Sequence, residues 1–268
     1  MDDRFLPPLL DETLAALSPG QPFVGMMHLN GTHFPYRVRE DQEVFGHASY
    51  LDRYDNSIRY QDGIVGALLD VLKARGRLER TVVVFTSDHG EGFGEHRGAN
   101  GHRLFYEEIM RVPCWVLLPQ PLAAAHGPAL RANRAVNVAN FDWLPTLVEL
   151  MGLTRVPEVE ALQRQIMGKS LLHPVPADRL ILAQNGTDAR RLAEGFGMMR
   201  GTRRLLFHLI GNAGELEYYD LADDPAERNN RWSAVEPAER QRWEADLAAF
   251  PVLDNQVRGA RTVTAQAH

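Results

Sequence analysis

The chain has 268 residues, of which 44% are hydrophobic and 24% charged, and its formal net charge is −6. This composition is ordinary for a globular protein, and the acidic balance argues against a nucleic-acid-binding protein, which usually presents a basic face. No apolar run reaches the ~18 residues that a membrane helix needs, and the acidic residues 1–4 do not open a signal peptide. The sequence therefore predicts neither a membrane helix nor a signal peptide in this chain, and the cellular location of the protein stays undetermined. The single cysteine, Cys114, excludes an intrachain disulfide and is expected to be a small core residue.

The first elements place a histidine after a strand. Leucines at helical spacing over residues 9–17 predict a helix that stops at 18–20, and the apolar run 22–28 predicts a buried strand. His33 follows this strand in a loop that contains glycine and proline. Taken alone, it is equally consistent with a surface histidine and with a site residue.

The next stretch carries most of the chemistry. An amphipathic pattern over 53–76 predicts a scaffold helix that Gly76 ends. The β-branched run within 81–87 then predicts a strand buried on both faces. It leads directly into Asp88 and His89, at the sheet edge where open α/β folds bind ligands. Aspartate and histidine suit a divalent cation, although an aspartate in this position is often only a turn residue.

The remainder of the chain predicts further strands and helices. Apolar runs at 112–118 and 180–183 are expected to be strands and 120–134 a loop, and the segment from 136 onward predicts a helix that Asp142 caps and Gly152 ends. Two β-type runs, 198–209 and 217–221, flank a glycine-rich hairpin signal, and 240–249 is expected to be a surface helix.

Several of these segments together resemble one family. The segment SDHGEGFGEH…GH…LFYEEIMRVPCWVLLP (87–119), the loop NGTHFPY (30–36) and the ending YYDLADDPAERNN (218–230) are similar to the sulfatase family within the alkaline-phosphatase-like superfamily. The resemblance implies a metal-dependent sulfuric-ester hydrolase. The loop around His33 and the helix at 53–76 also resemble phosphoethanolamine transferases, while the ending favours sulfatases.

The resemblance also implies roles for four residues. Asp88 and His89 match metal ligands, and His33 and His102 match groups that contact the anion or protonate the leaving oxygen. Glu91, Glu95 and His96, which flank them, are expected to support the site rather than bind its metal, and Asp2 and Asp3 are assigned no role. Ca²⁺, Mg²⁺, Mn²⁺ and Zn²⁺ are all compatible with such ligands. The expected substrate is a sulfate or phosphate ester.

The family's nucleophile has no counterpart among these residues. Sulfatases carry it in a C/S-x-P-x-R motif, which Cys114, followed by Trp115, does not match. The expectation is therefore a truncated or degenerate member with no appreciable turnover. The alternatives are a phosphotransferase and a non-catalytic remnant.

The expected fold is an α/β, alkaline-phosphatase/sulfatase-like, mostly parallel sheet flanked by helices, with a small antiparallel C-terminal subdomain. The predicted divisions are a partial sulfatase-like domain at 1–190, a β-hairpin and helix subdomain at 191–254, and a tail at 255–268. A missing first strand is expected to leave an exposed sheet edge through which the chain self-associates.

Overall fold

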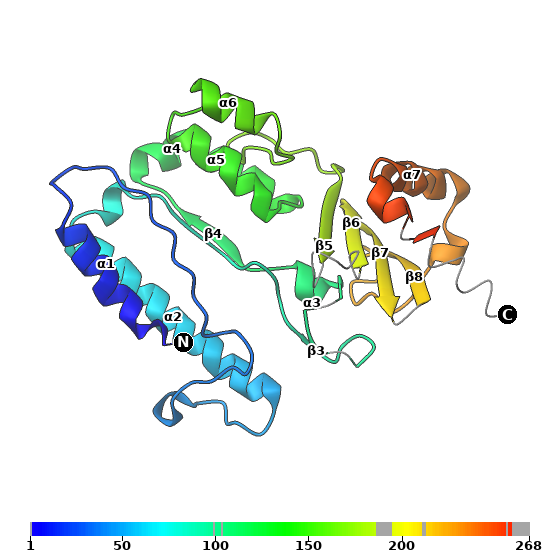
Figure 1. Ribbon diagram of the computed structural model, residues 1–268, viewed down its shortest axis with the longest axis horizontal. Coiled ribbons are helices and arrows are strands. Elements are labelled where there is room, and N and C mark those ends of the chain that lie inside the picture. Colours follow the sequence, from blue (N-terminus) through cyan, green and yellow to red (C-terminus); the bar gives the residue numbers. More distant parts are fainter. Residues whose placement is uncertain are drawn as a thin grey trace. The chain divides into compact units, whose positions relative to one another are not determined.

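The computed structural model describes residues 2–98, 100–102, 104–185, 195–210, 213–255 and 257–258 (Figure 1). The chain divides into two compact units. One comprises Met1–Val84 and Trp115–Ala123, and the other Phe85–Cys114 and Ala124–His268. The predicted domain boundary at 190 and most of the predicted tail lie outside the described residues. Each unit is considered by itself below.

The first unit is built on two helices that lie side by side, α1 (Leu6–Ala15) and α2 (Tyr50–Ala74). Leu10 and Leu14 of α1 pack against Leu72 of α2, so the leucine spacing seen in the sequence forms the core of this unit. Ser49 and Asp52 form a capping box at the start of α2, and Gly76, with φ of +61°, follows its end. The scaffold helix predicted at 53–76 is confirmed.

The mostly parallel sheet that was predicted is not seen in the described part of the chain. β1 (Val83–Thr86) and β4 (Cys114–Leu117) form a two-stranded sheet. Residues 22–28 do not form the predicted strand, and Val24 and Met26 are exposed. Among the described residues β4 pairs with β1 alone and is largely exposed. Cys114 is therefore an exposed residue rather than the predicted core residue.

The second unit contains an antiparallel sheet in the order β5-β6-β7-β8. Its strands are β5 (Ile181–Asn185), β6 (Gly195–Arg200), β7 (Arg203–Ile210) and β8 (Ala213–Asp220). The run predicted at 180–183 is a strand, but it pairs antiparallel with β6 instead of joining a parallel sheet. The run predicted at 198–209 breaks at Gly201, whose φ of +56° permits the turn between β6 and β7.

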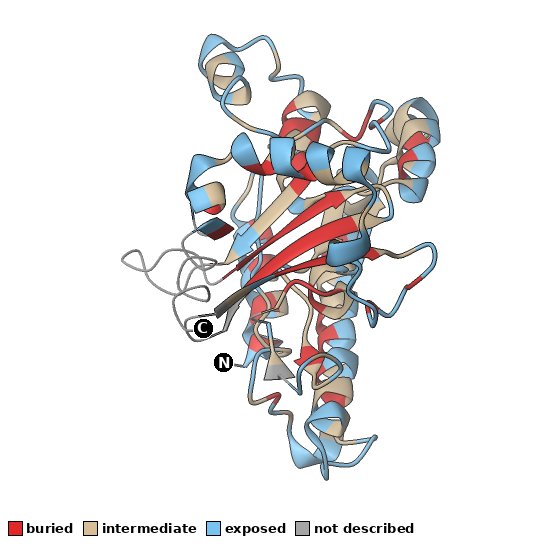
Figure 2. Cartoon of the chain, turned by 90° about the vertical axis from the view of Figure 1, so that its right-hand side faces the viewer, coloured by how far each residue is buried: buried red, intermediate tan, exposed pale blue. Residues whose placement is uncertain are grey.

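The surface helix predicted at 240–249 is present as α7 (Pro237–Ala248), and one side of it packs on this sheet. Trp243 and Leu247 join Phe196, Leu205 and Phe207 in one hydrophobic core. Figure 2 shows the sheet largely in the buried colour. The small antiparallel unit expected near the C-terminus is thus present, with four strands rather than a hairpin.

One of the remaining segments is a helix where a loop was predicted. The loop predicted at 120–134 is helix α4 (Gln120–Ala132), because its leucines and alanines favour a helix despite Pro128 inside it. The helix predicted between Asp142 and Gly152 is present as α5 (Trp143–Leu150). Further short elements are α3 (Glu107–Met110), α6 (Pro157–Gln163), β2 (Gly92–Phe93) and β3 (Asn100–Gly101).

Candidate functional site

Asp88 and His89 follow β1 directly and are held by local hydrogen bonds. The backbone N–H of His89 donates to Asp88 Oδ1 (3.1 Å), and Ser87 Oγ donates to the carbonyl oxygen of His89 (2.8 Å). His89 Nδ1 lies 2.7 Å from the carbonyl oxygen of Gly90. Because a carbonyl oxygen only accepts, this nitrogen carries a hydrogen, and Nε2 is the atom that can bind a metal ion.

The two predicted metal ligands face each other at the surface. Asp88 Oδ2 is 3.7 Å from His89 Nε2, and the side chains are 76% and 35% exposed. Partial burial acts to raise the pKa of Asp88, but the neighbouring His89 and hydrogen bonds from Ser87 and the backbone outweigh it and lower this pKa. Asp88 is therefore ionised near neutral pH. An anionic oxygen and an oriented imidazole nitrogen fit a divalent cation as two of its ligands.

His102 lies beside His89. The two rings stack with centroids 3.9 Å apart and planes 23° from parallel. His102 is exposed, so it can reach a substrate group. The structure therefore brings together three of the four residues to which the sequence assigned roles.

Gly90 fixes where this loop runs. Its N–H donates to the carbonyl oxygen of Ile109 (2.8 Å), which ties the loop to α3. A Cβ at position 90 would lie 2.0 Å from the carbonyl oxygen of Glu108, closer than real Cβ atoms approach. Only glycine permits the backbone to come this close to α3, and this contact determines where the backbone of the preceding His89 lies.

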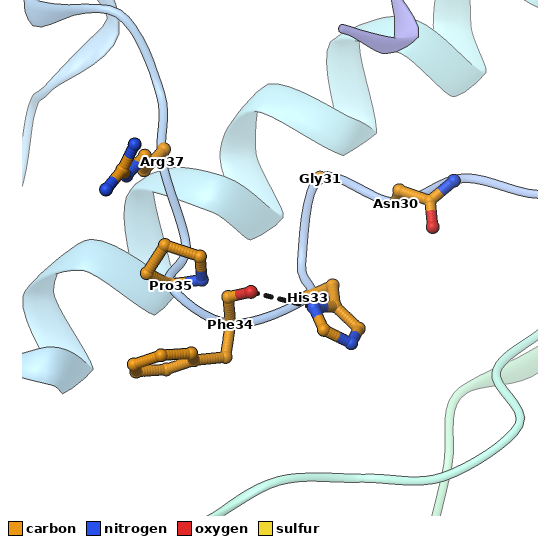
Figure 3. A pocket seen from close by; sticks show the side chains of 6 residues that line it. All are labelled: Asn30, Gly31, His33, Phe34, Pro35 and Arg37. Carbon is orange, nitrogen blue, oxygen red and sulfur yellow. Dashed lines mark hydrogen bonds between the residues drawn. The ribbon is translucent and has the colours of Figure 1, made fainter. Parts of the chain in front are cut away.

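The fourth predicted residue, His33, belongs to the other unit. It lines a pocket of about 540 Å³ together with Asn30, Gly31, Phe34, Pro35 and Arg37 (Figure 3). His33 Nδ1 lies 2.7 Å from the carbonyl oxygen of Phe34, so this nitrogen donates and Nε2 can face a ligand. The pocket thus combines an imidazole with the guanidinium of Arg37, groups that suit an anion.

Asp3, to which the sequence assigned no role, anchors the His33 loop. It is 1% exposed, and its Oδ2 accepts from the N–H groups of Asn30 and Gly31, both at 2.8 Å, and from Gln61. The partners are separated from it by 27 to 58 positions. Nothing in the local sequence around Asp3 indicates such contacts.

A buried network holds the end of the glycine-rich loop after β1 against the C-terminal sheet. Glu217 on β8 accepts hydrogen bonds from Tyr106 (2.6 Å), Tyr219 (2.7 Å) and Arg97. The N–H of Phe105 donates to His208 Nε2 (3.0 Å), so His208 donates to Glu217 through Nδ1, at 3.3 Å. Arg97, Phe105 and Tyr106 are therefore fixed by charged and polar groups inside the protein.

Comparison with known proteins identifies the family. The model of the family described as Sulfatase matches residues 1–153, more than half of the chain. The chain belongs to the sulfatase family. An N-acetylglucosamine-6-O-sulfatase of Bacteroides thetaiotaomicron is 28% identical over 207 residues, which cover 72% of this chain and 34% of that protein. A Δ4,5-hexuronate-2-O-sulfatase of the same organism is 26% identical, covering 71% of this chain and 38% of that protein.

Solved structures agree on the fold. A Bacteroides thetaiotaomicron protein studied for the metabolism of multiple glycosaminoglycans matches with a TM-score of 0.62 and 18% identity, over 97% of this chain and 59% of the other. A putative sulfatase from Bacteroides fragilis matches with a TM-score of 0.59 and 21% identity, over 86% and 53%. The sulfatase-like fold is thereby shown. This sulfatase-family chain spans about a third of the curated relatives' length, 34% and 38%.

No helix in the described part of this sulfatase-family chain is both long enough and apolar enough to span a membrane.

Proposed function

We propose that this chain supplies part of the active site of a metal-dependent sulfuric-ester hydrolase. Asp88 and His89 would hold a divalent cation, and His102 and His33 would contact the ester. The observation that carries the proposal is the arrangement after β1, where His102 stacks on His89 at 3.9 Å and His89 turns Nε2 toward the carboxylate of Asp88. Ca²⁺, Mg²⁺, Mn²⁺ and Zn²⁺ all remain compatible with these two ligands.

The bound cation would offset negative charge on the ester oxygens. The chain's own residues would orient the catalytic groups and donate a proton to the ester. The Nδ1–H bond to Gly90 holds the His89 ring in place, and the ring in turn supports His102 by stacking. A protonated His102 can give its proton to the bridging oxygen as the ester bond breaks, which makes the departing alcohol a better leaving group.

A sulfate ester is the favoured substrate class. The relatives described above are named as sulfatases, and the YYDLADDPAERNN ending (218–230) resembles sulfatases more than phosphotransferases. The loop around His33 still resembles phosphoethanolamine transferases, so a phosphate ester is the second candidate. The motif C/S-x-P-x-R does not occur in the 268 residues. We therefore expect the chain by itself to show no appreciable turnover.

Binding and turnover of model esters test the proposal together. The 268-residue chain is titrated with p-nitrophenyl sulfate and p-nitrophenyl phosphate in the presence of Mg²⁺ or Ca²⁺, while histidine ring signals are followed by NMR and released nitrophenol by absorbance. Signals of His89 and His102 are expected to shift with the sulfate ester and without nitrophenol release. His47→Gln, which removes an exposed histidine paired with Glu43, is the matched control for His102→Gln.

Four results are informative. Loss of binding in His102→Gln but not His47→Gln supports the assignment. Binding of the phosphate ester alone favours the phosphotransferase alternative, and no binding of either ester favours the non-catalytic remnant. Turnover that His89→Ala abolishes would show that the chain contains its own nucleophile and would contradict the expected inactivity.

A further inference from the structure

A second group of metal-ligand side chains lies apart from Asp88 and His89 in the sequence. Among the described residues, His96, Glu108 and Glu227 each offer an atom within 4.8 Å of the others. They come from the glycine-rich loop, from α3 and from the turn after β8. Their side chains are 9%, 20% and 0% exposed. These groups are therefore mostly withdrawn from water, unlike the surface carboxylates that cluster without a ligand.

His96 is oriented as metal-bound histidines typically are. Its Nε2 lies 3.0 Å from the carbonyl oxygen of Ala226, which only accepts, so Nε2 carries a hydrogen. The ring also stacks on Tyr106 with centroids 3.8 Å apart. A hydrogen bond from one ring nitrogen to a backbone carbonyl fixes the tautomer and leaves the other nitrogen to bind a metal.

The contact between His96 and Glu108 requires a proton or another positive species between its two atoms. His96 Nδ1 is 2.7 Å from Glu108 Oε1. When Nε2 holds the only ring hydrogen, Nδ1 and the carboxylate oxygen turn lone pairs toward each other and repel. A proton on the ring or on the carboxyl group, or a cation close to both atoms, removes this repulsion.

Glu227 provides the independent sign of a ligand. Its Oε2 accepts from the N–H of Glu107 at 2.6 Å, whereas Oε1 is buried without a hydrogen-bond partner. Arg204 Nε is 3.7 Å from Oε1, too far for a hydrogen bond, and Arg204 is itself bound to Glu107. A buried carboxylate oxygen without a donor is costly, and a metal ion supplies what it lacks.

We propose that His96 Nδ1, Glu108 and Glu227 bind a divalent transition-metal ion, with Zn²⁺ or Mn²⁺ as the best match. One imidazole nitrogen and two carboxylate oxygens suit these ions, and the two carboxylates balance the charge of the ion. The ion would join the glycine-rich loop, α3 and the turn after β8, and would so stabilise this unit.

This inference does not rest on the function proposed for Asp88 and His89. The full 268-residue chain is stripped of metal with a chelator and titrated with Zn²⁺ in competition with a chromophoric chelator. Bound metal per chain and the Zn²⁺-dependent change in melting temperature are measured. The variants Glu108→Gln and Glu227→Gln test the proposed site, and Asp88→Asn tests the separate pair of Asp88 and His89. The control is His173→Gln, which removes an exposed histidine that also contacts a glutamate, Glu149 at 2.8 Å.

The proposal predicts that both glutamate substitutions weaken one Zn²⁺ site at least about tenfold and abolish the Zn²⁺-dependent rise in melting temperature. Asp88→Asn and His173→Gln should leave that site intact. If Glu227→Gln does not fold, Glu108→Gln, whose side chain is partly exposed, decides the matter. Zn²⁺ binding that is unchanged in Glu108→Gln, or that Asp88→Asn alone removes, would overturn the proposal and leave a proton on His96 or Glu108 as the positive species.

Discussion

The glycine-rich loop after β1 begins and ends in opposite surroundings. At its start, Asp88 is exposed and held by contacts with its immediate neighbours. At its end, Arg97 and Tyr106 contact Glu217, which lies more than a hundred positions away and is 1% exposed. We therefore expect the Asp88 side chain to contribute little to stability, whereas the contacts of Arg97 and Tyr106 hold the far end of the loop against β8. This division would leave Asp88 accessible to the metal ion proposed for it.

The largest expected effect is that of Glu217→Ala. The substitution leaves Tyr106 and Tyr219 without their buried acceptor and Arg97 without one of its two carboxylate partners. Breaking a buried charged network costs about 3–5 kcal/mol. Glu215→Ala is the matched control, because Glu215 also pairs with Arg97 but is 54% exposed, and it should cost less than about 1 kcal/mol. Urea unfolding measures the free energy of unfolding of both variants. Equal losses in the two variants would contradict the predicted difference between Glu217 and Glu215.

Acid should weaken the same network. Burial alone would raise the pKa of Glu217, but hydrogen bonds from His208, Tyr106 and Tyr219 outweigh it and lower this pKa from 4.5 to about 2. A carboxyl with a lowered pKa stabilises the fold fully above its unfolded value and loses this effect as the pH falls through its folded value. The stability difference between wild type and Glu217→Gln is therefore expected to shrink between pH 4.5 and 2. A difference that grows on acidification would show that Glu217 is not held ionised.

The other unit offers a smaller contrast between two adjacent aspartates. Asp3 is 1% exposed and accepts from two backbone N–H groups, so Asp3→Ala should cost about 1–3 kcal/mol. Asp2 pairs with Arg4 at the surface, where solvent screens the pair, and Asp2→Ala should therefore have the smaller effect. Thermal unfolding compares them. Amide exchange at Asn30 and Gly31 should accelerate only in Asp3→Ala, and acceleration in both variants would refute an anchoring role specific to Asp3.

The sequence predicted what short-range signals encode. The capping residues and the periodicity of α2 lie within the helix itself, and the β-branched run before Asp88 marks β1. Stacking of His102 on His89 also involves residues of one loop, and the family resemblance named both.

Long-range contacts explain the errors. Residues 22–28 form a strand only if a neighbouring strand pairs with them, and their own sequence does not show this. The antiparallel direction of β5 is set by its partner β6, and the local sequence of β5 does not indicate that direction. The exposure of Cys114 depends on what covers β4. Asp3 and Glu217 have ordinary local sequences, and their importance comes from distant partners.

Sheet exposure gives a further, weaker expectation. Trp115 and Leu117 on β4 are 38% and 39% exposed, and β4 pairs only with β1 among the described residues. Exposed apolar strands tend to associate, so the chain is expected to self-associate as its concentration rises. Trp115→Lys should reduce the apparent mass in analytical ultracentrifugation by a measurable fraction, whereas Met167→Lys, which changes an exposed residue outside the sheets, should not. An unchanged mass in Trp115→Lys would exclude β4 as the contact.

The central claim is that Asp88 and His89 hold a divalent cation, and metal binding by the Asp88→Asn variant tests it most directly. Mn²⁺ is titrated calorimetrically into wild type, Asp88→Asn and Asp223→Asn, the last of which changes an exposed aspartate paired with Arg231. The account predicts that Asp88→Asn weakens one site at least about tenfold while changing the unfolding free energy by no more than about 0.5 kcal/mol, and that Asp223→Asn binds as wild type does. Wild-type Mn²⁺ affinity at every site of Asp88→Asn would contradict it.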